Sequence, residues 1–192
     1  MLGKLKITSN YPRATRVLEG FKKYVVSQSR RNLTMAGHKS SGNLYGSIKG
    51  YVTKKMNRNM KGRFTGGSEM PSLTFSMLEY GKYIDHGVKG SKASPMSARR
   101  SPYKFTGRYK TVPLKPITNW CKKKGINTSA AYPIAKSIYE KGIAGSMFFL
   151  RPYNKRLKRT LENYHRAVAD DVANNIANQI ERKLKSKLKA KK

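Results

Sequence analysis

The chain has 192 residues, of which 38% are hydrophobic and 10% aromatic, so it can bury a core and does not have the composition of a disordered protein. It carries 42 Lys and Arg residues against 9 Asp and Glu residues, a formal net charge of +33. A lone monomer with this charge repels itself, so we expect a polyanion or an acidic protein surface to face the protein. Nucleic acid is the commonest partner of this kind, and a basic surface that the organism or virion merely tolerates is the alternative.

Cysteine usage and hydropathy exclude several classes of protein. A single cysteine, Cys121, excludes an intrachain disulfide framework and a cysteine-based zinc site, and it fits synthesis in a reducing cytosol. The N-terminal segment lacks the apolar core of a signal peptide, and no apolar run approaches the roughly 18 residues of a membrane span. We therefore expect a soluble protein with a single domain over residues 1–192.

The first predicted element is a helix over residues 11–35. Pro12 suits its first turn, and Gly37 ends it. Its apolar stripe, spaced by three and four residues, consists of Val17, Leu18, Phe21, Tyr24 and Val25.

A β-hairpin is predicted next. A turn at residues 41–43 leads into β-type sequence at residues 48–52, and the glycine-rich, basic residues 57–70 indicate the hairpin loop. Residues 72–80 alternate apolar and polar side chains with a period of two, which is typical of a half-buried strand. We expect this strand to pair with the one before it.

The middle of the chain is predicted to hold short elements around a long loop. Residues 80–87 form a short helical turn that Gly87 closes, and residues 88–112 have little periodicity and form a loop. Loops of this length are usually functional or disordered. Two further helices are predicted over residues 115–125 and 128–141, each followed or ended by glycine.

Residues 145–153, with the sequence GSMFFLRPY, lead into the last predicted element. Pro152 starts a long helix, whose apolar stripe steps mostly by four residues from Tyr153 to Leu188. Thirty-odd residues at 1.5 Å each span roughly 50 Å, so the far end is expected to project or to pack on another subunit. The apolar side chains before Pro152 bury either in the core of their own protomer or at a subunit interface, and both interpretations stay open.

Chemistry typical of an enzyme is missing from the pattern. The three histidines have no ligand spacing, and Asp85 and His86 are neighbours on a turn, where adjacent side chains point apart. Asp170 and Asp171 are adjacent on a helix and do not face the same way, so a solvated face is the favoured interpretation. The glycines of residues 62–67 match neither phosphate-loop spacing. We expect no enzymatic activity, no metal and no cofactor.

Two basic, flexible loops, at residues 54–66 and 88–112, are the predicted nucleic-acid contacts. They lie in long stretches without any Asp or Glu, and aromatic residues interleave with the basic ones, a mixture that can grip a phosphate backbone and stack on bases. A solvated, mobile loop is the alternative. The candidate contact residues are Lys54, Lys55, Arg58, Lys61, Arg63, Arg99, Arg100, Lys104, Arg108 and Lys110.

Three short segments follow one another along the chain: SGNLYGSI, EYGKYIDHG and FFLRPY. Their order resembles the neck or tail-completion family of tailed bacteriophages, in which a GNLR-S-I segment precedes the sheet, a YA-YVE-G segment follows it and a PFLRPA segment opens the last helix. The matching residues are Gly42, Asn43, Leu44, Ser47 and Ile48, then Tyr80, Tyr83, Ile84 and Gly87, then Phe149, Leu150, Arg151 and Pro152. The resemblance covers roughly residues 13–180; His86, the long basic loop and the lysine-rich tail at residues 182–192 depart from it.

The resemblance implies an α+β fold, in which a small curved antiparallel sheet is packed by helices and followed by a long C-terminal helix. It also implies a ring-shaped homo-oligomer at the head–tail junction of a virion, with portal or adaptor proteins and tail proteins as neighbours and phage DNA passing through the channel. The protein would be made in the cytoplasm of the bacterial host. Candidate interface residues are Tyr80, Tyr83, Ile84, Phe148, Phe149, Leu150 and Arg151.

Two other functions fit parts of the pattern. A non-specific, DNA-compacting basic protein shares the charge but has no need for the ordered segments or for the apolar residues of 145–153. An RNA-binding ribosomal protein fits the charge and the size only.

Overall fold

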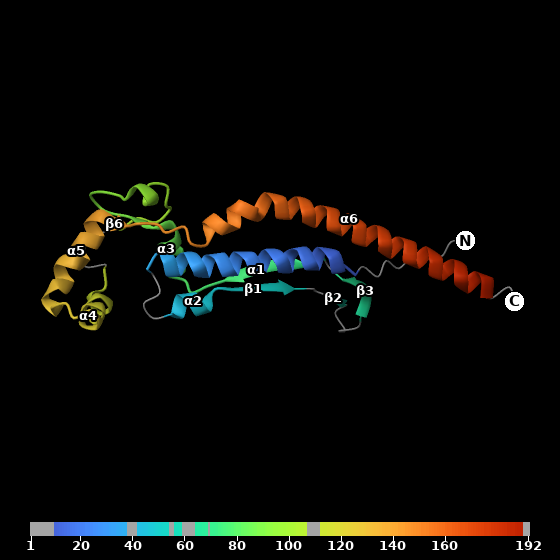
Figure 1. Ribbon diagram of the computed structural model, residues 1–192, viewed down its shortest axis with the longest axis horizontal. Coiled ribbons are helices and arrows are strands. Elements are labelled where there is room, and N and C mark those ends of the chain that lie inside the picture. Colours follow the sequence, from blue (N-terminus) through green and yellow to red (C-terminus); the bar gives the residue numbers. More distant parts are fainter. Residues whose placement is uncertain are drawn as a thin grey trace. The chain divides into compact units, whose positions relative to one another are not determined.

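The computed structural model describes residues 10–37, 42–53, 56–58, 64–68, 70–106 and 112–189 (Figure 1). The helices are α1 (Pro12–Met35), α2 (Asn43–Ser47), α3 (Gly81–His86), α4 (Leu114–Lys123), α5 (Ala131–Lys141) and α6 (Leu150–Lys189), with 3-10 turns η1 (Met96–Ala98) and η3 (Thr128–Ala130). The strands are β1 (Lys49–Thr53), β2 (Met56–Arg58), β3 (Phe64–Ser68), β4 (Ser72–Ser76), β5 (Val88–Lys89) and β6 (Gly142–Ile143). The predicted α+β class and the long C-terminal helix are confirmed.

The described strands pair in three antiparallel ladders of two strands each, β1–β4, β2–β3 and β5–β6. The predicted pairing of the hairpin is confirmed, with a continuous register from Lys49 opposite Ser76 to Thr53 opposite Ser72. Alternate residues of β4 are half-buried, as the period of two predicts. The β2–β3 ladder contains a register shift between Met56 and Arg58, and β5–β6 joins parts of the chain more than fifty residues apart.

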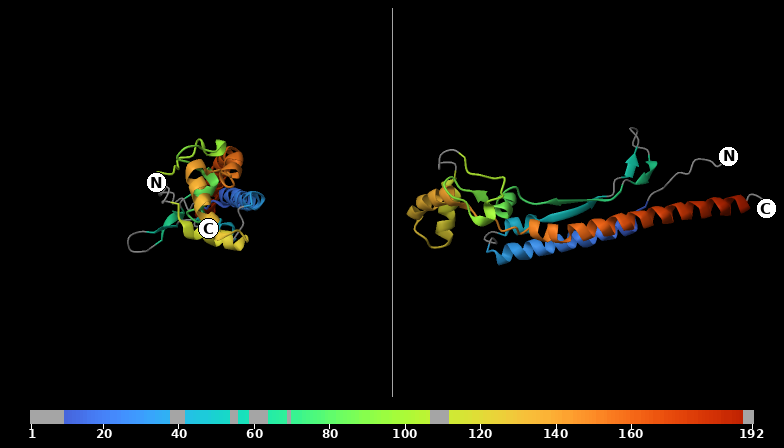
Figure 2. Two further views of the ribbon diagram at one scale, coloured as in Figure 1. Left: turned by 90° about the vertical axis from the view of Figure 1, so that its left-hand side faces the viewer. Right: turned by 90° about the horizontal axis from the view of Figure 1, so that it is seen from above.

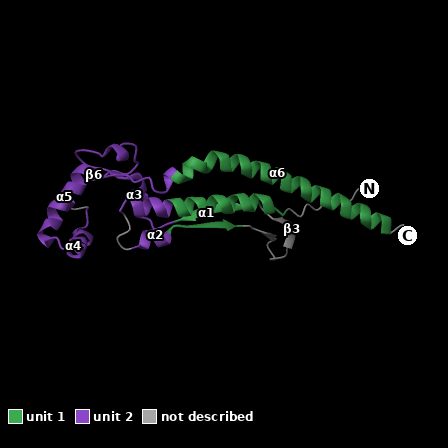
Figure 3. Ribbon diagram, viewed as in Figure 1, with its two compact units in different colours: residues 1–28, 48–76, 152–192 green, residues 29–47, 77–151 purple. Residues whose placement is uncertain are grey.

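Two compact units share the chain (Figure 3). Unit 1 comprises residues 1–28, 48–76 and 152–192, and unit 2 comprises residues 29–47 and 77–151. Each unit is therefore assembled from segments that are distant in sequence, and α1 and α6 contribute residues to both. That the whole chain forms one domain stays a prediction.

Unit 1 is built around an aromatic cluster. The ring of Phe21 in α1 meets Phe75 of β4 edge-on, with centroids 6.1 Å apart, and Tyr153 of α6 at 5.6 Å. Helix α1 lies close against β1, since a Cβ at Gly50 would meet the Lys22 side chain. The hydroxyl of Tyr164 donates to the carbonyl of Pro71 at 2.8 Å, which ties α6 to the start of β4.

The N-terminus of α1 is capped by α6, and the two helices lie side by side (Figures 1 and 2). The carboxylate of Asp171 accepts hydrogen bonds from the backbone N–H groups of Ala14, at 3.0 Å, and Arg13, at 3.3 Å. These are donors that the first turn of a helix leaves without an intrahelical partner. Asp171 is only 2% exposed, so its interpretation as part of a solvated face was wrong. Asp170, half-exposed, does face solvent and pairs with the Arg13 guanidinium at 3.2 Å.

Unit 2 packs short helices around buried apolar side chains. Leu33, Leu44 and Cys121 are buried, and α3 approaches α2 closely at Gly81, where a Cβ would meet Leu44 and Met77. Helix α2 was not predicted, because its five residues are too few to carry a hydrophobic period and follow the glycine of the predicted turn. Its Ser47 hydroxyl accepts from the N–H of Leu78 at 3.1 Å.

The segment at residues 88–106 makes hydrogen bonds to neighbouring elements along its length, and its predicted flexibility stays a prediction. Its backbone bonds to the β5 strand and to the end of α5, with Phe105 N–H donating to the Lys89 carbonyl at 2.9 Å and Ser91 N–H donating to the Tyr139 carbonyl at 2.9 Å. Ser101 is buried, and its hydroxyl donates to the Gly87 carbonyl at 2.7 Å. Residues 107–111 lie outside the described residues.

Helix α6 extends the predicted start by two residues, to Leu150, and its last turns expose their apolar stripe. Ile176, Ile180, Leu184 and Leu188 are all exposed, increasingly so toward the C-terminus. Within the described ranges, no helix combines the length and the apolar character that crossing a membrane requires.

Candidate subunit-contact site

Two of the three segments that carry the resemblance meet in unit 2. Asp85, at the end of α3, accepts hydrogen bonds from the N–H of Phe149 at 2.8 Å and from the N–H of Leu150 at 3.3 Å. The backbone also pairs, with Met147 N–H donating to the Asp85 carbonyl at 2.9 Å. Asp85 therefore caps the first turn of α6 from a position 64 and 65 residues earlier in the sequence.

Burial controls the charge of this cap. Asp85 is 1% exposed, and the loss of water raises the pKa of its carboxyl above the ordinary value. The two backbone N–H groups at the start of α6 oppose the rise in pKa, because they stabilise the ionised form. The cap thus places a carboxylate where a helix N-terminus favours negative charge, in a setting that disfavours any charge.

The same junction decides between core and interface for Phe148. Its ring is 0% exposed, and its carbonyl accepts from the side-chain amide of Asn32 at 3.2 Å. Phe148 is therefore a core residue of the chain and has no exposed surface with which to contact another molecule. Phe149 and Leu150 are half-buried and Arg151 is exposed, so these three candidates retain surface.

An apolar groove of about 680 Å³ opens on the surface of unit 2. The interface candidates Tyr80, Tyr83 and Ile84 of the α3 segment line one wall. The rest of its apolar lining includes Val88 and Phe105 of the 88–106 segment, Val112 just before α4, Ile117 of α4, Ile138 of α5 and Ile143 of β6. The structure thus gathers the second resembling segment and several other parts of unit 2 around one apolar groove.

Aromatic and charged contacts shape the rim of this groove. The rings of Tyr83 and Tyr103 meet edge-on with centroids 4.8 Å apart, and the Lys82 ammonium lies 5.1 Å from the centroid of Tyr83. Lys82 also bonds to Glu79 at 2.8 Å. That hydrogen bond lowers the pKa of the Glu79 carboxyl and raises the pKa of the Lys82 ammonium. Both groups are exposed, so this pair contributes little to stability.

The structure describes only some of the predicted nucleic-acid contacts. Arg99, Arg100 and Lys104 lie on the hydrogen-bonded 88–106 segment and are exposed. Arg58 lies in β2, and its side chain is outside the described part. The other candidates, Lys54, Lys55, Lys61, Arg63, Arg108 and Lys110, lie outside the described residues.

Two aromatic residues of the 88–112 segment pack on protein. The sequence suggested that Tyr103 and Phe105 could stack on bases, but Tyr103 packs on Tyr83 and also on His86 at 5.7 Å, and Phe105 packs on Tyr139 at 6.0 Å. The groove itself was not predicted, because its walls come from elements up to 63 residues apart. The apolar residues among the basic ones of 102–117 were the signal that could have indicated it.

Among the described residues, no group of three or more His, Cys, Asp or Glu side chains is placed to hold a metal ion. Comparison of the chain with protein-family models, with curated proteins and with solved structures finds no significant match.

Proposed function

We propose that the protein is a structural virion protein of a phage head–tail junction, where copies form a ring in the neck or tail-completion position around the DNA path. The observation that carries this proposal is the groove of unit 2. Its wall is formed by Tyr80, Tyr83 and Ile84, which belong to one of the resembling segments, and its apolar lining is open to solvent. Large exposed apolar surfaces mark places where another molecule binds.

A second exposed apolar surface favours head-to-tail contacts between subunits. The last turns of α6 expose Ile176, Ile180, Leu184 and Leu188 in a line. A subunit with two different apolar surfaces favours head-to-tail contacts, and such contacts close into rings when the rotation between neighbours allows it. The two surfaces are distinct in sequence and lie on different elements, as a head-to-tail interface requires.

The net charge supports the same proposal and sets a condition on it. Copies that each carry +33 repel one another, so a ring needs a polyanion or a high salt concentration to offset the repulsion. DNA in a central channel supplies that polyanion. A non-specific DNA-compacting protein is the second candidate, favoured by the charge alone, and it has no need of the groove.

The oligomeric state of a groove variant tests the proposal. Tyr80→Ser removes an exposed ring from the groove, and Tyr51→Ser removes a comparably exposed ring from β1, outside the groove. We expect wild type and Tyr51→Ser to form rings in electron micrographs at high salt, and Tyr80→Ser to shift toward smaller species. Equal assembly of all three proteins would remove the groove from the interface.

A further inference from the structure

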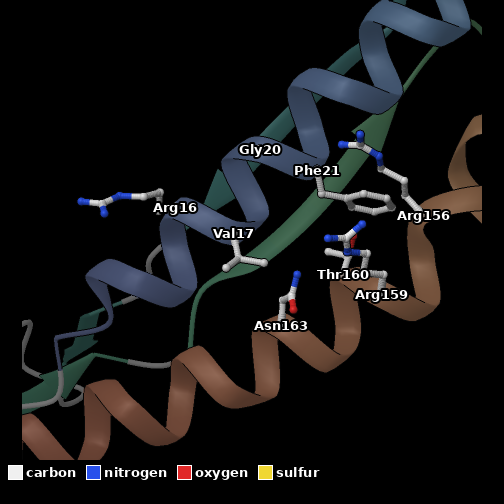
Figure 4. A pocket seen from close by; sticks show the side chains of 8 residues that line it. All are labelled: Arg16, Val17, Gly20, Phe21, Arg156, Arg159, Thr160 and Asn163. Carbon is white, nitrogen blue, oxygen red and sulfur yellow. The ribbon is translucent and has the colours of Figure 1, made fainter.

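Unit 1 contains a basic pocket of about 320 Å³ between α1 and α6 (Figure 4). In Figure 4, Asn163 points from α6 toward α1, and Arg16 extends outward from α1. The polar and charged lining consists of Arg16, Arg156, Arg159, Thr160 and Asn163. None of these residues belongs to the basic loops that the sequence indicated.

Only some of the arginines along the α1–α6 seam have a partner in the described part of the chain. At one end of the α1–α6 seam Arg13 pairs with Asp170, and near the other end the Arg156 guanidinium lies 3.8 Å from the centroid of the Tyr24 ring. Within the described part of the chain, Arg16 and Arg159 make no ion pair, and no Asp or Glu lines the pocket. Two guanidinium groups therefore remain available to an anion from outside the protomer.

A glycine keeps the α1 wall of the pocket open. Gly20 lies in the middle of α1, where glycine destabilises a helix relative to alanine. A Cβ at this position would meet nothing within 4 Å, so no neighbouring side chain requires the glycine. Its effect is to leave room in the pocket beside Arg16.

We propose that this pocket binds phosphate groups of a nucleic-acid backbone. Guanidinium groups present forked donors that match phosphate oxygens, and threonine hydroxyls and asparagine amides are common additional donors to phosphate. The pocket offers Arg16, Arg159, Thr160 and Asn163 for these bonds. Binding of this kind positions a backbone and reads no sequence. The site lies within one protomer, so the inference goes beyond ring assembly and does not depend on it.

Duplex binding by a charge-matched pair of variants tests the assignment. The double variant Arg16→Gln/Arg159→Gln removes two charges from the pocket, and Lys122→Gln/Lys123→Gln removes two exposed charges from α4 in unit 2. The probe is a fluorescent DNA duplex of about 20 base pairs, long enough for several phosphate contacts, followed by anisotropy over a range of salt concentrations. We expect about tenfold weaker binding for the pocket variant, and a slope of log affinity against log salt that is smaller by about two. The α4 variant should change both quantities less.

Gly20→Glu provides an independent test that leaves every arginine in place. A carboxylate at this position reaches Arg16 one turn earlier and competes with phosphate for the pocket. Gly20→Gln adds the same bulk without the charge. We expect Gly20→Glu to weaken duplex binding about tenfold and Gly20→Gln to change it much less, with thermal unfolding by circular dichroism confirming that both variants fold.

Three outcomes would overturn the assignment. Equal losses of duplex affinity in the pocket and α4 variants would indicate a general charge effect. Unchanged duplex binding by Gly20→Glu would show that phosphates bypass the pocket. Binding of polyglutamate, which stands in for an acidic protein surface, is measured on the same variants. If Arg16→Gln/Arg159→Gln loses polyglutamate binding but keeps duplex binding, the ligand is an acidic protein surface. Ring formation is recorded separately in electron micrographs, so failure of this inference and failure of the proposed function are distinguishable.

Discussion

Asp85 in unit 2 and Asp171 in unit 1 both accept hydrogen bonds from backbone N–H groups at the start of a helix, but their surroundings differ. Each is almost fully buried, and each caps the first turn of a helix distant in sequence. Around Asp171 the cap is reinforced by polar contacts, the Arg13–Asp170 ion pair and the Asn175 side chain on the Asn10 carbonyl at 2.8 Å. Asp85 instead lies near the fully buried Phe148, and desolvation raises the pKa of the Asp85 carboxyl.

The difference shows how an extremely basic chain uses its few acids. Eight of the nine acidic residues lie in the described part of the chain; of these, five form ion pairs with Lys or Arg, and the two buried aspartates cap helices. Negative charge in the described part of the chain is therefore largely engaged within the chain itself. Both proposals require that an external polyanion offsets the excess of Lys and Arg.

The largest expected effect is in the apolar setting of unit 2. Phe148→Ala should lower the free energy of unfolding by about 3–5 kcal/mol, because it removes a fully buried ring and leaves a cavity. Phe149→Ala, at a half-buried position, should have a smaller effect on stability. Urea unfolding followed by circular dichroism measures both. A Phe148→Ala protein as stable as wild type would contradict its place in the core.

The two caps can be compared directly by truncation. Asp85→Ala and Asp171→Ala should each lower the free energy of unfolding by about 1–2 kcal/mol, because each leaves two backbone N–H groups at a helix start without an acceptor. Urea unfolding of the two variants measures the effects. If either variant unfolds like wild type, that aspartate does not cap its helix in solution.

The contribution of the Asp85 cap to stability is expected to depend on pH. Because the folded-state pKa of Asp85 is raised above its unfolded value, its contribution to stability is fully present below the ordinary aspartate pKa and is lost as pH rises through the raised folded pKa. Asp85→Asn cannot titrate, so its stability relative to wild type should improve as pH rises from about 3 to 7. Unfolding free energies of the two proteins at several pH values give this difference. A change in the opposite direction would mean that the N–H groups of Phe149 and Leu150 outweigh burial.

The smallest effect is expected at the surface beside the Asp171 cap. Asp170→Asn breaks the ion pair with Arg13, in which both side chains are about half-exposed. Such pairs contribute about 0–1 kcal/mol, so the unfolding curve should hardly move, and less so at high salt. A loss comparable to that of Asp171→Ala would show that the two neighbouring carboxylates act as one cap.

Local patterns in the sequence predicted most helices and the β1–β4 hairpin, but they did not predict contacts between residues that are distant in sequence. The period of three and four residues in α1, the alternation in β4 and the glycines after α1, α3, α4 and α5 placed these elements close to their observed bounds. The resemblance also indicated Tyr80, Tyr83 and Ile84 as candidate interface residues, and they line the groove. These features depend on neighbours within a few residues, which a single sequence displays.

The caps and the arginine pocket depend on contacts that sequence spacing does not encode. Asp171 meets Ala14 across 157 residues, and no periodicity distinguishes it from the exposed Asp170 beside it. Arg16 and Arg159 line one pocket only because α1 and α6 pack side by side. Tyr103, for which the sequence suggested stacking on bases, packs on Tyr83, because a ring in a basic segment can pack on its own protein as readily as on a base.

The most direct test of the central proposal is electron microscopy of the purified protein, alone at high salt and mixed with a portal complex. The proposal predicts closed rings, or incorporation at the neck position of the assembly. A protein that stays monomeric under every condition, and binds duplex DNA tightly with a steep dependence on salt, would contradict it and favour the DNA-compacting alternative.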